Sequence, residues 1–444
     1  MGKSYDVIIV GGGITGASLL YMLSSYTNIK SVLLIEKYGE LAPLNSKNTN
    51  NAQTLHFGDI ETNYSIAEAT RTKRAAQMLV RYIDALPEHE RRGLVARCQK
   101  MVLGVDDFEL EILDRIYYSR IKELFPNLKY IKKEQIARLE PNVAKGRDPE
   151  QKIAALLSDN GRMVDFGRLT RSFAKKAKEN RRAKIEITLD TKVNQIKEVG
   201  DHYEIYTSRG MFTADFVACA AGTYSLYFAK SLGYNENLSI LSIGGNFYYS
   251  KNVLRGKVYR VQIGGIPFAA VHGDPDIANK GITRFGPTVT LPFGLEKGHG
   301  GTFLDYVRTF DLDLATLQSL MNIFANKDIR RIIARNVLYD MPLVGKREFL
   351  KKEVSYIVPS LKLGDLKMGR DIGGIRPQII DENKKSLVLG AGKIKGDGII
   401  FNITPSPGAS SCIASSMEDS MYIAEYLGRE FNSELFDKRI GHGL

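Results

Sequence analysis

Residues 5–36 read YDVIIVGGGITGASLLYMLSSYTNIKSVLLIE, and this stretch decides the fold of the amino-terminal region. The apolar run Val7–Val10 predicts a buried strand, a helix is expected from Ile14 to about Ser25, and Val32–Ile35 predicts a second strand. A glycine-rich turn joins the first strand to the helix. This arrangement is typical of the βαβ unit that binds a dinucleotide. A glycine turn without a ligand is the plainer alternative, and the flanking elements argue against it.

Three glycines and one acid in this unit have predicted roles. Gly11 allows the tight turn, Gly13 lets the backbone approach a pyrophosphate, and Gly16 lets the helix pack closely on the strand. The helix start offers free N–H groups and a partial positive charge to phosphates. Glu36 lies 20 residues after Gly16, where it can accept hydrogen bonds from a ribose diol. This acid disfavours NADP, because it would repel the 2′-phosphate, and it leaves NAD or FAD.

Composition limits the class of protein. The chain has 444 residues, of which 43% are hydrophobic, so it can form two domains or one large composite. Its three cysteines, Cys98, Cys219 and Cys412, are scattered, which indicates a reducing compartment without disulfide bonds or a zinc site. The first strand starts too early for a signal peptide, and no apolar run approaches the ~20 residues of a membrane span. We therefore expect a soluble or peripheral protein.

The net charge of +12 permits several interpretations. A basic surface suits nucleic acid, an anionic membrane or the attraction of acidic substrates, and it can also be plain solvated lysine. The basic residues are spread along the chain, and no basic run carries the interleaved aromatic residues of a single-strand binding face. We therefore expect no nucleic-acid partner.

The remaining chain alternates between loops, helices and strands. Residues 41–64 form a polar, Asn-rich stretch that predicts a long functional loop. Helices are expected at 65–87, in two stretches of 107–140 broken at Pro126, after a loop that starts at 161, and across most of 302–340. Strands are expected between 184 and 219, with a hairpin at Gly200-Asp201, and in 241–301 and 371–400.

Two later segments are predicted to return to the nucleotide. The buried strand Phe216–Cys219 ends in Ala220-Ala221-Gly222, where small residues let the backbone pass beside a ligand. The turn at Ser406–Ser411 opens a long amphipathic helix, which is either an ordinary capped helix or a second phosphate- or flavin-facing dipole. The predicted nucleotide domain is therefore discontinuous. We expect it to comprise residues 1–100, 160–238 and 371–430, with a substrate domain at 101–159 and 239–370 and a tail at 431–444.

Nearly the whole chain resembles the malate:quinone oxidoreductases, FAD enzymes of the glycine/D-amino-acid-oxidase-like superfamily. The resemblance is carried by GGGITG with Glu36, NNAQTLHFGDIETNY, DFVACAAG, PFAAVHGDPD…TRFGPT, GIRPQ and SPGAS. It is closer to a shorter, divergent branch, because the longer form has PHLDTR for AVHGDPD and GQRVQV for GIRPQI. The resemblance implies an α/β (α+β) fold, with a Rossmann-like FAD-binding domain and a β-rich substrate domain.

The resemblance also implies which residues contact FAD. They are the glycine turn, the end of the second strand, the polar loop and the two later segments, namely Gly11, Gly13, Ile14, Thr15, Gly16, Glu36, Lys37, Asn51, Gln53, Thr54, Val193, Ala221, Gly222, Pro407, Gly408, Ala409 and Ser410.

Oxidation of a 2-hydroxy acid needs a base for the hydroxyl proton, a hydride acceptor and cations for the carboxylates. We expect His272 to be the base, because imidazole titrates near neutrality, with Asp274 or Asp276 as its partner. Arg376 is expected to hold one carboxylate through its planar fork, and Arg284 is the second candidate.

Two further residues are candidates for the same centre. His56 follows the polar loop and can hydrogen-bond the substrate or stabilise negative charge on the flavin. Gln378 is expected beside the substrate or the pyrimidine edge of the flavin.

The resemblance therefore implies oxidation of L-malate to oxaloacetate, with electrons passed to a quinone. L-2-hydroxyglutarate or L-lactate is the alternative substrate, and a flavin-dependent RNA-modifying or RNA-binding protein is the alternative class. A quinone acceptor implies a cytoplasmic protein that attaches to an anionic membrane surface. The candidate amphipathic helices are Leu113–Leu139 and Leu317–Ile333, and both also suit ordinary core packing.

Overall fold

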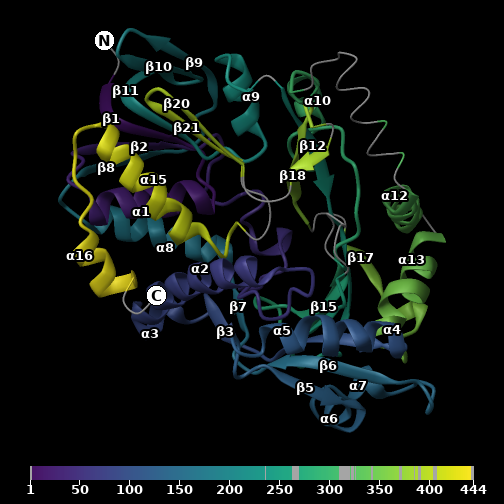
Figure 1. Ribbon diagram of the computed structural model, residues 1–444. Helices are drawn as coiled ribbons and strands as arrows, with labels where there is room; N and C mark the ends of the chain where they lie inside the picture. The colour runs from purple at the N-terminus through teal and green to yellow at the C-terminus, as the bar shows by residue number, and fades with distance from the viewer. Residues whose placement is uncertain are drawn as a thin grey trace.

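The computed structural model describes residues 3–235, 237–262, 270–309, 321, 325, 327–341, 344–369, 373–384, 386–388, 392–403 and 408–441. Within these residues, one large sheet with its helices occupies one side of the molecule, and a second large sheet with the α12–α13 region occupies the other (Figure 1). The small sheet of β12 (Leu238–Gly244) and β18 (Ile375–Asp381) lies between them (Figure 1).

The main sheet contains the predicted βαβ unit. Its described strands run in the order β20-β21-β11-β1-β2-β8, and β10 and β9 extend it from β11. The pairs β1–β11, β1–β2, β2–β8 and β11–β21 are parallel, so these strands end at a shared edge. The strands are β1 (Lys3–Val10), β2 (Ser31–Ile35), β8 (Lys184–Thr188), β9 (Val193–Val199), β10 (His202–Thr207), β11 (Gly210–Cys219), β20 (Gly392–Gly396) and β21 (Ile399–Ile403).

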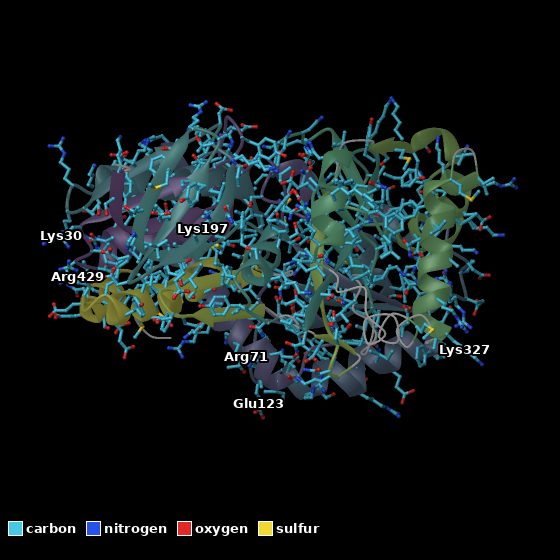
Figure 2. All side chains as sticks on the ribbon, turned by 90° about the horizontal axis from the view of Figure 1, so that it is seen from above. Lys30, Arg71, Glu123, Lys197, Lys327 and Arg429 are labelled. Carbon is cyan, nitrogen blue, oxygen red and sulfur yellow. The ribbon has the colours of Figure 1, made fainter. Side chains whose placement is uncertain are left out.

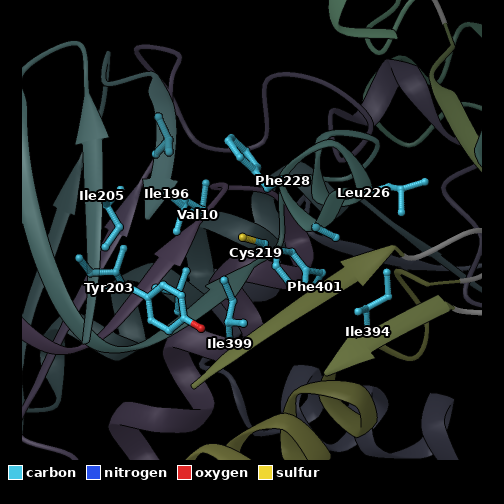
Figure 3. Close-up of a cluster of buried hydrophobic side chains, with 14 of the residues drawn as sticks. Val10, Ile196, Tyr203, Ile205, Cys219, Leu226, Phe228, Ile394, Ile399 and Phe401 are labelled. Carbon is cyan, nitrogen blue, oxygen red and sulfur yellow. The ribbon is translucent and has the colours of Figure 1, made fainter. Parts of the chain in front are cut away.

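Helices cover this sheet because both of its faces are apolar. The helix α1 (Ile14–Tyr26) is buried almost all round, since it packs between the sheet, α8 (Phe166–Glu179) and α15 (Cys412–Tyr426). The core on the other face gathers Val10, Cys219 and Phe401 from three parallel strands (Figure 3). The adjacent helices are α2 (Ile66–Ala85), α3 (Glu88–Arg91), α9 (Tyr224–Ser231), α16 (Ser433–Phe436) and η6 (Asp437–Gly441).

The second large sheet belongs to the middle of the chain. Its described strands run in the order β17-β13-β16-β15-β14-β4-β6-β5, and only the β14–β4 pair is parallel. The strands are β4 (Lys100–Val105), β5 (Lys129–Lys132), β6 (Ile153–Ser158), β13 (Phe247–Lys251), β14 (Lys257–Arg260), β15 (His272–Pro275), β16 (Ile282–Gly286) and β17 (Lys367–Gly369). The smaller sheets add β19 (Ser386–Val388), which pairs with β18, and the pair of β3 (Val95–Arg97) with β7 (Arg162–Val164).

The remaining described helices come from the polar loop after β2 and from the middle of the chain. They are η1 (Asn48–Asn50), α4 (Asp106–Glu111), η2 (Ile112–Tyr118), α5 (Ser119–Ile121), α6 (Lys133–Leu139), α7 (Pro141–Ala144), η3 (Gly300–Thr302), α10 (Phe303–Val307), α12 (Lys327–Asp340), α13 (Val344–Phe349), η4 (Leu350–Val354), α14 (Ser355–Ile357) and η5 (Leu363–Asp365).

The observed elements confirm the predicted α/β class and most of the predicted segments. The helix predicted at 65–87 is α2, whose first turn is closed by a capping box between Ser65 and Glu68. The prediction for 107–140 is partly wrong, because β5 separates α6 from the first helical stretch. The predicted loop at 161 contains β7, which pairs with β3.

Charged side chains project from both ends of the molecule. Figure 2 shows Lys30 and Arg429 at one end and Lys327 at the other. None of the described helices combines the length and the apolar character that crossing a bilayer requires.

Candidate functional site

A deep cavity opens where the parallel strands of the main sheet end, which is the usual ligand position in an open α/β sheet. Most of the predicted ligand residues line it: Gly11, Gly13, Ile14, Thr15, Glu36, Lys37, Asn51, Gln53, Thr54, His56, Val193, Ala221, Gly222, Arg376, Gln378, Gly408, Ala409 and Ser410. Gly16, His272 and Arg284 do not line it, and Pro407 lies outside the described residues.

The glycine turn has the geometry that its sequence predicts. Gly11 has φ +111°, and a Cβ there would lie 2.5 Å from the carbonyl oxygen of Ala220. A Cβ on Gly16 would lie 2.0 Å from the carbonyl oxygen of Gly11, so this glycine permits the close contact of α1 with the turn. A Cβ on Gly13 would meet only Ser46 Oγ, at 3.5 Å, which leaves its backbone open to the cavity.

Glu36 is held at the end of β2 by two backbone donors. Its carboxylate accepts hydrogen bonds from the N–H groups of Gly12 (2.7 Å) and Tyr38 (3.0 Å), and burial raises its pKa. The adjacent Lys37 pairs with Glu296 at 2.6 Å. Both acids and Lys37 line the same end of the cavity, which suits polar recognition of a nucleoside.

Most polar side chains of the loop are used within the protein. Asn51 donates to the carbonyl oxygens of Asn45 (3.1 Å) and Lys47 (2.8 Å), and Gln53 donates to Asp276 at 3.2 Å. Thr54 shares a 2.5 Å hydrogen bond with Tyr259. These contacts of Asn51, Gln53 and Thr54 shape the cavity wall, and the expected contact of the three residues with FAD stays a prediction.

Both later segments that were predicted to come back to the nucleotide reach the cavity. The end of β11 supplies Ala221 and Gly222, and the turn before α15 supplies Gly408, Ala409 and Ser410. Ser410 Oγ also accepts a hydrogen bond from the N–H of His56 at 3.0 Å, which joins the turn before α15 to the polar loop.

His56 lines the cavity and forms an acid–base pair with Glu61, which is not a lining residue. Nδ1 of His56 lies 2.6 Å from Oε1 of Glu61. Burial alone would raise the pKa of Glu61, but the hydrogen bond with His56, the charge of His56 and the nearby Lys100 lower that pKa to about 2. In the described part of the chain, Nε2 of His56 has no hydrogen-bond partner. An ionised carboxylate at Nδ1 leaves Nε2 able to accept a proton.

The position of His272 does not suit the predicted base. Its side chain is only 3% exposed, and its ring stacks on Tyr259 with centroids 4.7 Å apart. Nδ1 lies 3.1 Å from the carbonyl oxygen of Ala270. Nε2 lies 3.0 Å from Oδ2 of Asp274, although the two atoms are not well aligned for a hydrogen bond. Both nitrogens therefore already face protein oxygens.

Arg376 faces the cavity from β18, and Gln378 lies on the same strand two residues later. No carboxylate in the described ranges pairs with Arg376, whose pKa is lowered by burial and raised in part by Tyr64 and Tyr259. Arg284 is different, because it is 1% exposed and its Nε lies 3.3 Å from Asp276. The expectation that Arg284 holds a substrate carboxylate is therefore not supported by its position.

The cavity fits a dinucleotide cofactor. Gly13 leaves a bare backbone beside the start of α1, and the wall of Gly408–Ser410 precedes the start of α15. Two helix starts therefore face one cavity, and Glu36 lies beside the glycine turn, which matches the pyrophosphate and ribose of such a cofactor. No cluster of potential metal ligands occurs among the described residues, and the three cysteines are free.

Sequence reasoning missed several residues of this site. Ser46 Oγ accepts a hydrogen bond from the N–H of Ile14 (3.0 Å), and Glu61 orients His56. An acid five residues after a loop histidine was the only signal for Glu61, and spacing within a loop does not predict a contact. Nothing in the sequence marked Lys257, which reaches the cavity loop from β14.

Comparison with solved structures defines the class. The chain has the fold of FAD-dependent oxidases. Its similarity to the L-α-glycerophosphate oxidase of Mycoplasma pneumoniae, solved with FAD bound, has a TM-score of 0.67 at 20% identity and covers 95% of this chain and 94% of that one. Glycine oxidase from Geobacillus kaustophilus gives 0.65 at 16% identity, over 95% of each chain.

Sequence comparison then gives the family. The family model for malate:quinone oxidoreductase matches residues 3–436, and the chain belongs to this family. A probable malate:quinone oxidoreductase of Campylobacter jejuni is 38% identical over 99% of both chains. The malate:quinone oxidoreductase of Helicobacter pylori is 37% identical, over 99% of this chain and 98% of its own. Human mitochondrial L-2-hydroxyglutarate dehydrogenase is more distant, at 25% identity over 93% of this chain and 87% of its own.

Proposed function

We propose that this chain binds FAD in the cavity and uses it to oxidise L-malate to oxaloacetate, with a quinone as electron acceptor. Membership of the malate:quinone oxidoreductase family supports the substrate and the acceptor. The glycine turn and the turn before α15 would hold FAD, which would supply the acceptor for the hydride that leaves C2 of the substrate. One observation of the site carries the proposal: Arg376, which has no carboxylate partner among the described residues, and His56, which pairs with Glu61, line the same cavity.

His56 takes the role of base in this proposal, in place of His272. Its Nε2 accepts the proton of the C2 hydroxyl group, and Glu61 stabilises the imidazolium that results. Arg376 binds a carboxylate of malate through two parallel hydrogen bonds. Gln378, on the same strand, offers an amide to the substrate or the cofactor. His272 and Arg284 support the cavity loop from behind the wall.

The test is the absorption spectrum of the purified protein under anaerobic conditions. The protein should be yellow, and L-malate should bleach it without NAD. A soluble quinone should then restore the colour. Stronger bleaching by L-2-hydroxyglutarate or L-lactate than by L-malate would show that this acid, and not malate, is the substrate. Protein that folds but takes up no FAD would refute the proposal.

We also infer that the protein associates peripherally with an anionic membrane on the cytoplasmic side. The net charge of +12 supports this, whereas its spread over both ends of the molecule argues against a nucleic-acid face (Figure 2). In the candidate helix Leu113–Leu139, the side chains of Leu113, Tyr117 and Ile121 are buried, so this segment packs inward.

The second candidate helix, Leu317–Ile333, lies largely outside the described residues. The described α12 and its C-terminal neighbours expose Val337, Met341 and Val344. Because the net charge is positive, the protein should co-sediment with phosphatidylglycerol vesicles but not with phosphatidylcholine vesicles. Its binding to the phosphatidylglycerol vesicles should weaken as the salt concentration is raised. Equal binding to both lipids would contradict the electrostatic part of this inference.

We propose, finally, that the chain divides into the discontinuous FAD-binding domain and the substrate domain expected from the sequence. The main sheet supports this division, because its described strands come from residues 3–35, 184–219 and 392–403.

A further inference from the structure

A buried ion pair in the second sheet reaches the cavity loop from behind. Lys257 in β14 and Asp274 in β15 are both fully buried, and Nζ lies 3.1 Å from Oδ1. Nζ also donates a 2.7 Å hydrogen bond to the carbonyl oxygen of Ala52, a residue of the cavity wall. The second oxygen of Asp274 lies 3.0 Å from His272. The chain of contacts thus runs from His272 through Asp274 and Lys257 to the loop.

The same short loop is held at neighbouring points. Gln53, which has a positive φ of 53°, accepts a hydrogen bond from the N–H of Ile277 (2.9 Å) and donates to Asp276 (3.2 Å). Tyr259, which stacks on His272, bonds to Thr54 at 2.5 Å. Residues 52–54 are therefore fastened to β14 and to the end of β15, and His56 follows two residues later.

Stability alone does not explain a lysine and an aspartate at these positions. Burying both charges costs solvation free energy that their attraction often only repays, and apolar residues of similar volume commonly stabilise a fold as well or better. Apolar side chains cannot donate a hydrogen bond to the carbonyl group of Ala52, however. The distinctive contribution of the pair is this donor, held in place by Asp274.

We propose that Lys257 is a positioning residue that fixes the loop of Ala52–Thr54 against FAD and thereby places His56. The proposal rests on the proposed FAD site. Lys257 touches neither the cofactor nor the substrate, because it does not line the cavity.

The first test compares K257M with R147M. Arg147 is a partly buried cation of the same region, whose guanidinium bonds to the carbonyl oxygen of Val143 (2.6 Å) and to Gln151 (3.1 Å), away from the cavity. K257M should weaken FAD binding about tenfold, measured by the fluorescence of released FAD, and should alter the visible circular dichroism of bound FAD. R147M should change neither quantity, even if its melting temperature falls.

A second pair of variants separates the donor from the charge and serves if K257M does not fold. Both K257Q/D274N and K257M/D274L are neutral, but only the first keeps an N–H donor for Ala52. The amide pair should bind FAD more tightly than the apolar pair. Equal FAD affinity and equal visible circular dichroism in the two double variants would overturn the proposal. The proposal would also be overturned if K257M and the wild type had the same FAD affinity and the same visible circular dichroism. Failure of the wild type to bind FAD would instead refute the proposed function.

Discussion

At the residue scale, His56 and His272 differ in what surrounds their ring nitrogens. His56 lines the cavity, with Nδ1 on Glu61 and Nε2 without a partner in the described part of the chain. His272 has protein oxygens near both nitrogens and lies behind Tyr259. A general base needs a free nitrogen that reaches the substrate, so the surroundings favour His56.

H56Q should lower kcat for malate by about a thousandfold, because the hydroxyl proton then has no positioned acceptor. FAD binding should change little, since the backbone N–H of His56 still reaches Ser410. H272Q is the matched control and should reduce kcat much less. Single-turnover bleaching by malate measures both variants, and the reverse order of effects would return the role of base to His272.

E61Q should change the dependence of stability on pH. The pKa of Glu61 in the folded protein, about 2, lies below its ordinary value of 4.5. The ionised group therefore stabilises the fold above about pH 4.5, and this contribution, at most about 3 kcal/mol, is lost as the pH falls toward 2. Urea unfolding should show a steeper loss of stability over this range in the wild type than in E61Q. Parallel curves would contradict an ionised Glu61 paired with His56.

R376K should retain the charge but lose the planar fork that fits a carboxylate. We expect the dissociation constant for malate, obtained by titrating flavin absorbance, to rise by about tenfold to a hundredfold. R284K tests the alternative anchor. A larger effect of R284K on malate binding than of R376K would show that the buried arginine reaches the substrate after all.

At the scale of elements, the glycine turn joins β1, α1 and the end of β11. Each glycine faces a different neighbour. A Cβ added to Gly11 would meet the carbonyl group of Ala220, and a Cβ added to Gly16 would meet the carbonyl group of Gly11. A Cβ added to Gly13 would meet almost open space. The three glycines therefore divide into two that permit packing and one that permits a ligand.

G16A should destabilise the FAD-free protein by about 3 kcal/mol or more, because its Cβ would lie 2.0 Å from a backbone oxygen. G13A should leave that stability nearly unchanged, because its φ of −76° suits alanine. Its methyl group should instead weaken FAD binding, because it lies where a pyrophosphate approaches. Thermal melts without FAD and FAD titrations distinguish the two variants. Normal FAD affinity in G13A would contradict the assigned position of the pyrophosphate.

At the scale of the whole molecule, the cavity is built from segments that are far apart in the sequence. Its lining residues come from segments that include 10–15, 35–56, 191–193, 220–228, 243–247, 287–289, 374–378 and 408–410. A ligand that contacts all of these segments binds the folded state and has no comparable site on the unfolded chain.

FAD at 1,000 times its Kd should therefore raise the free energy of unfolding by about 4 kcal/mol. The melting temperature of FAD-free protein, measured over a series of FAD concentrations, should rise accordingly. G13A supplies the control. Because this variant should bind FAD more weakly, the same rise in its melting temperature should need higher FAD concentrations. A melting temperature independent of FAD would mean that the cofactor does not bridge these segments.

The sequence alone determined the βαβ unit, the backbone geometry of its glycine turn and the two later segments Ala221–Gly222 and Gly408–Ser410 that reach the cavity. These features depend on backbone conformation and on side-chain periodicity, which short stretches of sequence encode locally. The residues of the glycine turn and of the two later segments accordingly line the cavity as expected, apart from Gly16, which packs against the turn.

Only the tertiary structure decided which histidine nitrogen and which arginine lack a partner among the described residues, and that Lys257 contacts the loop. Arg284 and Arg376 look equally suitable in the sequence, but Asp276 neutralises the first and no described carboxylate neutralises the second. The physical reason is that the charge and hydrogen bonds of a side chain depend on neighbours from distant segments. Those neighbours are fixed only when the sheets pack together.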